Sequence, residues 1–352
     1  MVRLIDWSEY RYDTVHVDLC DNEITEMNWE GVPSGLQEIY LSYNQITEMN
    51  WEGAPSGLQK IDLDGNHITE MNWEGAPNGL ESISLHDNEI VEMNWEGAPS
   101  GLQKILLSNN EIEEMNWEGA PSGLQRIELE DNYITEIDWE DSPNGLNFVG
   151  LYGNKITEIN WYKSPSGLQK IVLGGNQITE TNWEDVPSGL ETISLYDNQI
   201  TEMNWEGAPS GLRYINLGCN RIAEINWEDV PNGLKEIDLE DNQITEMNLE
   251  GAPSDLQEIY LEYNQITEIN WEGIPEGIEI TTGDDLDELR FEYMNSMKYI
   301  KSKAKSMRPI TDLIKHLSLT NPENNKYKVV RKYCGVEFRE LMEDVLRFDL
   351  VH

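Results

Sequence analysis

An asparagine recurs every 22 residues along this chain, twelve times in all, from Asn22 to Asn264. The same phrase returns around each asparagine, as in residues 58–79, which read LQKIDLDGNHITEMNWEGAPNG. A repeat of this length predicts a solenoid, because one unit alone cannot bury its apolar side and must stack on its neighbours. The twelve copies also align with one another, so constant positions can be distinguished from variable ones.

The first half of each copy holds the pattern Leu-x-x-Ile-x-Leu-x-x-Asn-x-Ile. Ile39 and Leu41 alternate with Tyr40 and Ser42, which is the two-residue period of a strand with one buried face. The pattern resembles the leucine-rich repeat over about residues 14–278, and it is similar to the short repeats of bacterial effectors and giant viruses. The resemblance implies an α/β solenoid in which these segments form a parallel β-sheet on one face.

The second half of each copy contains a proline in all twelve cases and a glycine in most, as in residues 74–79. These residues disfavour a regular helix, so we expect extended, turn or short 3₁₀ backbone on the return side. Helices there would need about 8–10 Å per coil against about 4.8 Å for paired strands. Without them, the curvature should be shallow. The asparagines should be buried, with each amide bonding the backbone of its own coil and of the next.

A tryptophan occupies the same place in eleven copies, and Leu249 replaces it in the remaining one. A single apolar exception is typical of a buried position, because leucine preserves burial and loses only the ring contacts. We therefore expect the tryptophans to pack in the core. The alternative is that they form an exposed platform for carbohydrate rings.

The two ends of the chain depart from the repeat. Residues 1–13 are predicted to form an N-terminal cap, because Ile5 and Trp7 keep the register of Met27 and Trp29 while the Pro and Gly positions are lost. The solenoid is predicted over residues 14–280, and the composition changes after it. Residues 281–352 are predicted to form a small α-helical C-terminal module, with helices over about residues 284–308, 311–319 and 336–348. That module either caps the last coil or recruits a second partner.

The charge is extreme and concentrated in the repeats. The net charge is −43, and residues 281–352 hold 13 of the 24 Lys and Arg but only 12 of the 67 Asp and Glu. Residues 1–280 are left with 11 cations against 55 acids. Such a field repels nucleic acid and anionic membranes, and it attracts proteins with a basic or mixed surface. A solvated, solubilising surface is the simpler interpretation of the same charge.

The cysteines and the N-terminus indicate the compartment. Cys20, Cys219 and Cys334 are odd in number, and the first two belong to coils too far apart to be bridged. The first residues are too charged for a signal peptide, and no long apolar run follows them. We expect a monomer in the reducing cytoplasm, which is the host-cell cytoplasm for a viral or intracellular bacterial source.

The outward strand positions vary from copy to copy, whereas the glutamate two residues after the second Ile is present in all twelve. Variation limited to one face is typical of a binding surface. Aromatic, cationic and small residues gather in the copies around residues 146–221. The predicted partner-binding site comprises Phe148, Tyr152, Lys155, Lys170, Val172, Tyr196, Arg213, Tyr214 and Arg221. The alternative is that outward positions drift freely and the exposed aromatics are scattered by chance.

The sequence contains few residues in patterns that are typical of catalytic or metal-binding sites. The sequence has no phosphate-binding glycine loop, Cys-x-x-Cys or His-Glu-x-x-His motif, so no cofactor is predicted. Asp64, Ser84 and His86 fall on neighbouring strands, but an open sheet offers no enclosed pocket for a catalytic triad. Asp62, Asp64, His67 and His86 offer a divalent-metal site as an alternative, but neither a metal site nor an enzyme is predicted.

Three functions remain, in order. The first is an intracellular protein–protein interaction module that binds a partner on the variable, concave strand face. The second is a structural or solubilising acidic repeat protein without one specific partner, whose stacked glutamates hold divalent cations. The third is an adaptor that recruits cellular machinery through the C-terminal helices.

Overall fold

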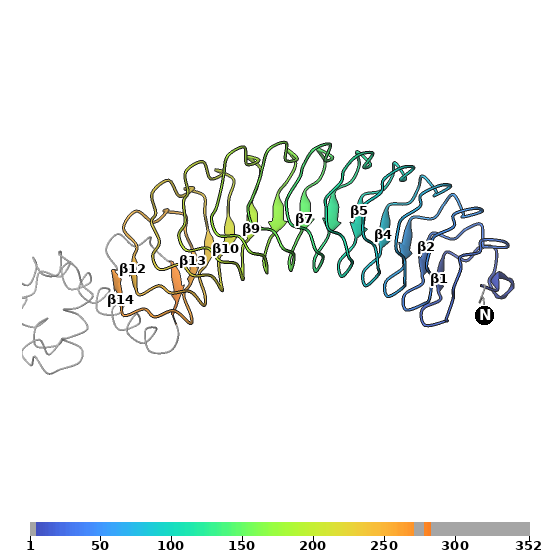
Figure 1. Cartoon of the computed structure of the whole chain (residues 1–352), viewed down its shortest axis with the longest axis horizontal. Coiled ribbons are helices and arrows are strands. Elements are labelled where there is room, and N and C mark those ends of the chain that lie inside the picture. Colours follow the sequence, from blue (N-terminus) through green and yellow to red (C-terminus); the bar gives the residue numbers. More distant parts are fainter. Residues whose placement is uncertain (1–4, 271–277, 283–352) are drawn as a thin grey trace, which may run out of the picture. The chain divides into compact units, whose positions relative to one another are not determined.

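The computed structural model describes residues 5–270 and 278–282 of the 352-residue chain. It divides into two compact units. The first comprises the chain as far as Ile200 together with residues 204–217, and the second comprises residues 201–203 and the chain from Gly218 onward. Both units consist of coils that begin with a short strand and return through turns (Figure 1). The helices predicted over residues 284–308, 311–319 and 336–348 lie outside the described residues.

The first unit contains a parallel sheet whose three-residue strands pair in chain order (Figure 1). The strands are β1 (His16–Asp18), β2 (Glu38–Tyr40), β3 (Lys60–Asp62), β4 (Ser82–Ser84), β5 (Lys104–Leu106), β6 (Arg126–Glu128), β7 (Phe148–Gly150), β8 (Lys170–Val172), β9 (Thr192–Ser194) and β10 (Tyr214–Asn216). They pair without a shift, so Ile61 lies between Ile39 and Ile83. The constant repeat length explains this, because a slip of one residue would turn the buried side chains to the other face.

The second unit repeats the arrangement with fewer strands. Its strands β11 (Glu236–Asp238), β13 (Glu258–Tyr260) and β15 (Glu279–Thr281) pair in parallel on the strand side. On the return side, β12 (Glu246–Asn248) and β14 (Glu268–Asn270) form a second, two-stranded parallel sheet. The extended backbone predicted for the return half is thus regular enough here to make a ladder of its own.

The core is built from the aliphatic positions of the repeat pattern. In the coil that begins at Leu58, the side chains of Leu58, Ile61, Leu63 and Ile68 are all 0% exposed. Burial of each such side chain contributes about 1.5–3 kcal/mol. The two faces of each short strand therefore differ sharply, with the central residue inside and its neighbours outward.

The asparagine ladder, the repeated positions from Asn22 to Asn264, ties successive coils together. Asn66 is 3% exposed, and its Oδ1 accepts the N–H of Ile46 at 3.0 Å. Its Nδ2 donates to the carbonyl oxygens of Leu63 at 2.9 Å and Leu41 at 3.0 Å. These hydrogen-bond partners lie in the asparagine's own coil and in the coil before it. The predicted bonds to the following coil are therefore wrong. The direction follows from the path of the chain, since the amide points back along the solenoid.

The repeat tryptophans that the structure describes, from Trp29 to Trp227, are buried on the return side, as the single leucine exception predicted. Trp51 is 1% exposed, its ring stacks on Trp29 and Trp73 at centroid distances of 6.4 Å, and its Nε1 donates to the carbonyl of Asn72 at 2.7 Å. Leu249 is itself 0% exposed. Because the repeat tryptophans from Trp29 to Trp227 are all buried, they offer no exposed platform for carbohydrate rings.

The strand side is the narrower side of the first unit. Five pairs of neighbouring tryptophan rings have centroids 6.3–6.4 Å apart, whereas paired strands are about 4.8 Å apart. The strand face of this unit is therefore concave. The difference is smaller than helices would impose, and among the described residues there is no α-helix.

The start of the chain continues the tryptophan column. A 3₁₀ helix, η1 (Trp7–Glu9), begins after Asp6, whose carboxylate accepts the N–H of Ser8. The Trp7 ring stacks on Trp29 at 6.3 Å, and its Nε1 donates to the carbonyl of Asn28 at 2.6 Å. Residues 5–13 thus cover the tryptophan of the first coil, while the proposed boundaries of the cap and of the C-terminal module stay predictions.

Candidate functional site

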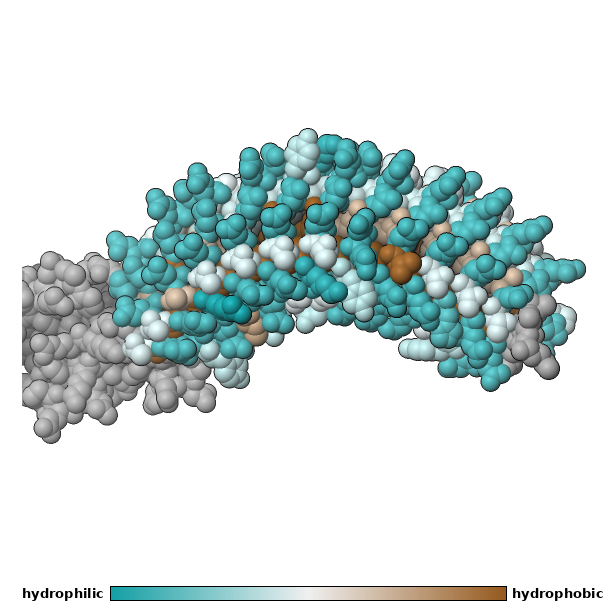
Figure 2. Space-filling model, in the orientation of Figure 1, coloured by the Kyte–Doolittle hydropathy of each residue, from teal (hydrophilic) through white to brown (hydrophobic). Residues whose placement is uncertain are grey.

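The first unit carries an aromatic and cationic patch on the outward positions of strands β6 to β9. The strands themselves bear Phe148, Lys170 and Val172, and Tyr152 and Tyr196 follow two residues after β7 and β9. The two tyrosines are 38% and 39% exposed, while Phe148 and Val172 are half-buried. We name Phe148, Tyr152, Lys170, Val172 and Tyr196, with Arg126 described next, the central patch. Most of the surface in view is hydrophilic, with a narrow band of less polar residues running through it (Figure 2).

Phe148 is held between two cations from the neighbouring strands. Arg126 on β6 and Lys170 on β8 pair with Phe148 across the sheet. The Arg126 guanidinium lies 3.5 Å from the ring centroid, and the Lys170 ammonium lies 5.8 Å from it. Arg126 also donates from Nε to Glu128 at 2.6 Å. The ring and guanidinium are thereby fixed in place before any partner arrives.

Arg126 was missed by sequence reasoning. A signal was present, because Lys60, Lys104, Arg126 and Lys170 occupy the same first position of their strands. These four are a large share of the 11 cations in residues 1–280. Reading the outward positions as columns across the coils would have shown that four of the ten strands of this unit begin with a lysine or arginine.

Glycines let side chains lie flat across neighbouring coils. A Cβ atom on Gly174 would stand 2.8 Å from Cδ2 of Tyr152 and 3.0 Å from the carbonyl oxygen of Tyr196. A Cβ atom on Gly150 would stand 2.0 Å from Oε1 of Glu130. The small residues therefore admit the Tyr152 ring and the Glu130 carboxylate. The patch is therefore flat. Along each strand direction, its cations come before the buried central residue and its acids come after it.

The other predicted residues make no contact with Phe148 or its two cations that the structure records. The Lys155 ammonium lies 4.3 Å from the Tyr133 ring, in the turn after the asparagine. The guanidinium of Arg213 donates to the backbone carbonyls of Ser210 and Leu212, so it turns toward its own loop. Tyr214 stands on β10, next to β9. Arg221 belongs to the second unit.

The polar residues near β3 and β4 do not form a catalytic group. The Ser84 hydroxyl donates to Asp64 at 2.6 Å, and the backbone N–H of His86 donates to the same oxygen at 2.9 Å. The His86 ring faces Glu128 instead, at 3.9 Å. Burial raises the pKa of Asp64, and the charge of Asp62 adds to this, while the hydrogen bond from Ser84 opposes it. The serine therefore serves the carboxylate and is not activated by the histidine.

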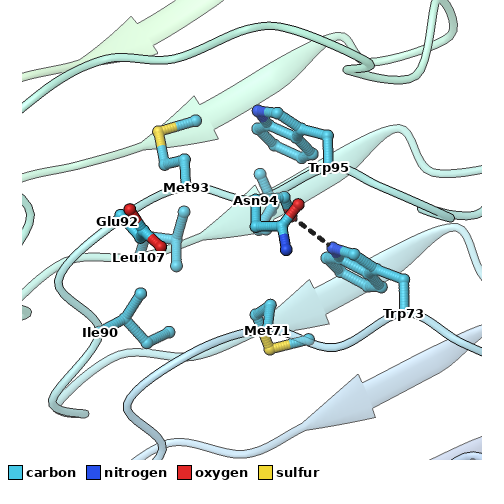
Figure 3. Close-up of a pocket in the computed structure, with 9 residues that line it drawn as sticks. Met71, Trp73, Ile90, Glu92, Met93, Asn94, Trp95 and Leu107 are labelled. Carbon is cyan, nitrogen blue, oxygen red and sulfur yellow. Dashed lines mark hydrogen bonds between the residues drawn. The ribbon is translucent and has the colours of Figure 1, made fainter.

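The described part of the chain offers little to a metal ion or a small molecule. Over residues 5–270 and 278–282, no three or more His, Cys, Asp and Glu side chains are placed to hold a metal ion. A cavity of about 10 Å³ lies among Met71, Trp73, Met93 and Trp95, beside the bond from Trp73 to the Asn94 carbonyl (Figure 3). That volume holds one water molecule at most. In the described residues, no helix is long and apolar enough to cross a membrane.

Comparison with known proteins identifies the fold. No protein-family model matches the sequence, and no curated protein sequence matches it. Solved structures do match. YopM from Yersinia enterocolitica WA-314 has a TM-score of 0.55 and 21% identity over 78% of this chain and 61% of its own. The fold is the leucine-rich repeat. The 61% coverage means that this chain spans less than two thirds of the YopM chain.

Two further leucine-rich-repeat structures cover more of their own length. The leucine-rich repeat domain of APL1B matches with a TM-score of 0.60 and 18% identity, over 73% of this chain and 78% of that domain. A chain in the octameric complex of Latrophilin 3, Unc5D and FLRT2 (LRR) matches with a TM-score of 0.61 and 18% identity, over 76% of this chain and 90% of its own. At these identities the likeness concerns the fold alone.

Proposed function

We propose that this leucine-rich-repeat protein binds another protein through the strand face of its first unit, at the central patch. The observation that carries the proposal is the split between constant and variable positions. Every coil keeps its buried aliphatic residues, asparagine and proline, while the outward strand positions differ from coil to coil. Function on such a scaffold resides in the positions that vary.

The composition and rigidity of the central patch support this proposal. Aromatic residues and arginine are the side chains that most often dominate binding energy at protein interfaces. Phe148 is already stacked between Arg126 and Lys170, and Tyr152 already lies against Gly174. Ordering these side chains on binding therefore costs little entropy. The neighbouring structure with FLRT2 (LRR) is of a protein complex, which supports the same kind of role here.

The charges around the patch define the kind of partner. Arg126 and Lys170 precede the buried residues of their strands, and Glu128 and Glu130 follow on the other side of the patch. A partner with a mixed surface, presenting acids to one edge and cations to the other, meets both rows. We place this interaction in the cytoplasm, in keeping with the odd, widely separated cysteines of the sequence.

Affinity capture from a eukaryotic cell lysate tests the proposal. The full-length protein is compared with Phe148→Ala/Tyr152→Ala, which removes two rings of the patch. The matched control is Tyr12→Ala/Tyr162→Ala, which removes two rings that are 78% and 63% exposed outside the patch. The patch variant should lose the main captured protein and the control should retain it. Identical captured proteins for all three would reject the central patch as the binding site.

A further inference from the structure

The strand face of the second unit is the most acidic part of the sheet. On β11, β13 and β15, the first residues are Glu236, Glu258 and Glu279, which lie side by side in register. Asp238, Glu240 and Glu262 continue the acidic face further along the strands. We name these six residues the acidic face. In the first unit the same strand positions hold cations such as Arg126 and Lys170, so the two faces differ in kind.

The acidic face has no cation of its own among the described residues. The cations in the described part of the second unit are Arg221 and Lys235, and no ion pair joins either to the acidic face. Neutral donors reach two of the carboxylates, since Tyr260 bonds Glu258 and Thr281 bonds Glu262 at 3.0 Å. Within the described part of the chain, no cation therefore compensates the charge of the face.

The raised pKa values of these carboxylates also indicate that their negative charges are crowded. Burial raises the pKa of Glu236, and the charges of Glu258 and Asp238 raise it further. Burial likewise raises the pKa of Glu240, with Asp238 and Glu262 adding to it. Strand neighbours are about 4.8 Å apart, so equivalent carboxylates on paired strands, such as Glu236 and Glu258, lie close together. Carboxylates crowded and half-buried in this way gain more from a cation than separated, fully exposed ones.

A complementary segment follows in the same chain. Between Glu292 and Asp312 the sequence contains no acid, and it carries Lys298, Lys301, Lys303, Lys305 and Arg308. These five cations close the helix predicted over residues 284–308, and their charge is opposite to that of the six carboxylates of the acidic face.

The connection between segment and face is long enough. The chain leaves β15 at Thr281, and Lys298 lies 17 residues further on. Even as a helix, a connection of that length spans about 25 Å, whereas β11 is two strand spacings, about 10 Å, from β15. Tethering also raises the local concentration of the segment to the millimolar range, about what a short flexible linker provides.

We propose that residues 298–308 of this chain dock on the acidic face of strands β11, β13 and β15 and act as its tethered basic ligand. The docked segment covers carboxylates that would otherwise attract basic proteins, so an external basic partner has to displace it. This proposal concerns another face and another occupant than the central patch. Either one can fail without the other.

Limited trypsin digestion of the full chain tests the docking, because trypsin cleaves after lysine only where the chain is accessible. The face variant is Glu236→Gln/Glu240→Gln/Glu262→Gln, and the matched control is Glu48→Gln/Glu70→Gln/Glu92→Gln on the exposed return side. Cleavage after Lys298, Lys301, Lys303 and Lys305 is followed by mass spectrometry. Cleavage after Lys326 and Lys328 is the internal reference, and near-ultraviolet circular dichroism of the tryptophans verifies folding.

At low salt, the face variant should be cleaved in this segment about tenfold faster than wild type, which corresponds to about 1.4 kcal/mol spread over three partly exposed ion pairs. The control variant should match wild type. In about 0.5 M salt, where charges are screened within a few ångströms, all three proteins should be cleaved alike. Equal rates in wild type and the face variant at low salt would overturn the proposal. So would protection that grows with protein concentration, because that result assigns the docked segment to a second copy.

Discussion

The asparagine ladder offers the sharpest quantitative prediction. In Asn132→Ala, the backbone N–H of Ile112 loses its acceptor, and the carbonyl oxygens of Leu107 and Leu129 lose donors at 2.9 and 3.1 Å. Asn132 is 3% exposed, so water cannot replace these bonds without opening the coil. With about 1–3 kcal/mol for each buried group left unsatisfied, the local free energy of unfolding should fall by about 3–5 kcal/mol.

Native-state hydrogen exchange is the suitable assay for Asn132→Ala, because a long repeat array need not unfold in one step. The reporters are the amides of Leu107 and Leu129, whose own acceptors, on Glu128 and Gly150, are untouched by the substitution. Their exchange should accelerate by about a hundredfold or more, at 1.4 kcal/mol per factor of ten. The control is Asn144→Ser, at an exposed turn position where other coils carry serine. Acceleration of less than about fivefold, or an equal effect of the control, would refute the account of the ladder.

Further predictions concern the tryptophans, the glycines, the acids and bound cations. Trp117→Leu should lower stability by about 2–4 kcal/mol in urea denaturation, because it removes stacking on both sides and the bond to the Asp138 carbonyl; a change within error would contradict this. Gly174→Ala should displace the Tyr152 ring, lower stability by about 1–2 kcal/mol and weaken partner binding, whereas unchanged binding would separate the ring from the site. Burial, followed by the charge of Glu262, raises the pKa of Asp238, so the stability linked to its protonation is present at low pH and is lost as pH rises through the folded-state pKa. Asp238→Asn should therefore raise the melting temperature at neutral pH and lose that advantage in acid, and an advantage that grew in acid would reverse the assignment. Millimolar calcium or magnesium should raise the melting temperature beyond a matched monovalent salt if the stacked glutamates hold divalent cations, and equal shifts would exclude specific binding.

Much of the fold could be predicted from the sequence because a fixed period determines register. Once Ile39 and Ile61 are known to be equivalent, their pairing across the sheet and their burial follow from stacking alone. The burial of the tryptophans followed from one exception, Leu249. Prediction was weaker where direction mattered, since the period does not say whether Asn66 bonds forward or backward along the solenoid.

The candidate site was harder to predict than the fold, because it depends on where long side chains lean. Nothing in the period indicates that Arg126 turns onto Phe148 in the next coil, or that Arg213 turns back to its own loop. The contact of Tyr152 with Gly174 depends equally on a side-chain conformation. Columns of equivalent outward positions carry part of this information, since four of the ten strands of the first unit begin with a lysine or arginine. The identity of the partner depends also on the partner's own surface, which this sequence does not contain.

Hydrogen exchange of the full chain, with and without the captured partner, is the decisive test of the proposed binding of a protein to the variable strand face of the first unit. Partner binding should slow the exchange of amides in β7, β8 and β9 and in the residues just after them, and it should leave the return side unchanged. Protection confined to the tryptophan and glutamate segments of the return side, or spread evenly over all coils, would contradict it.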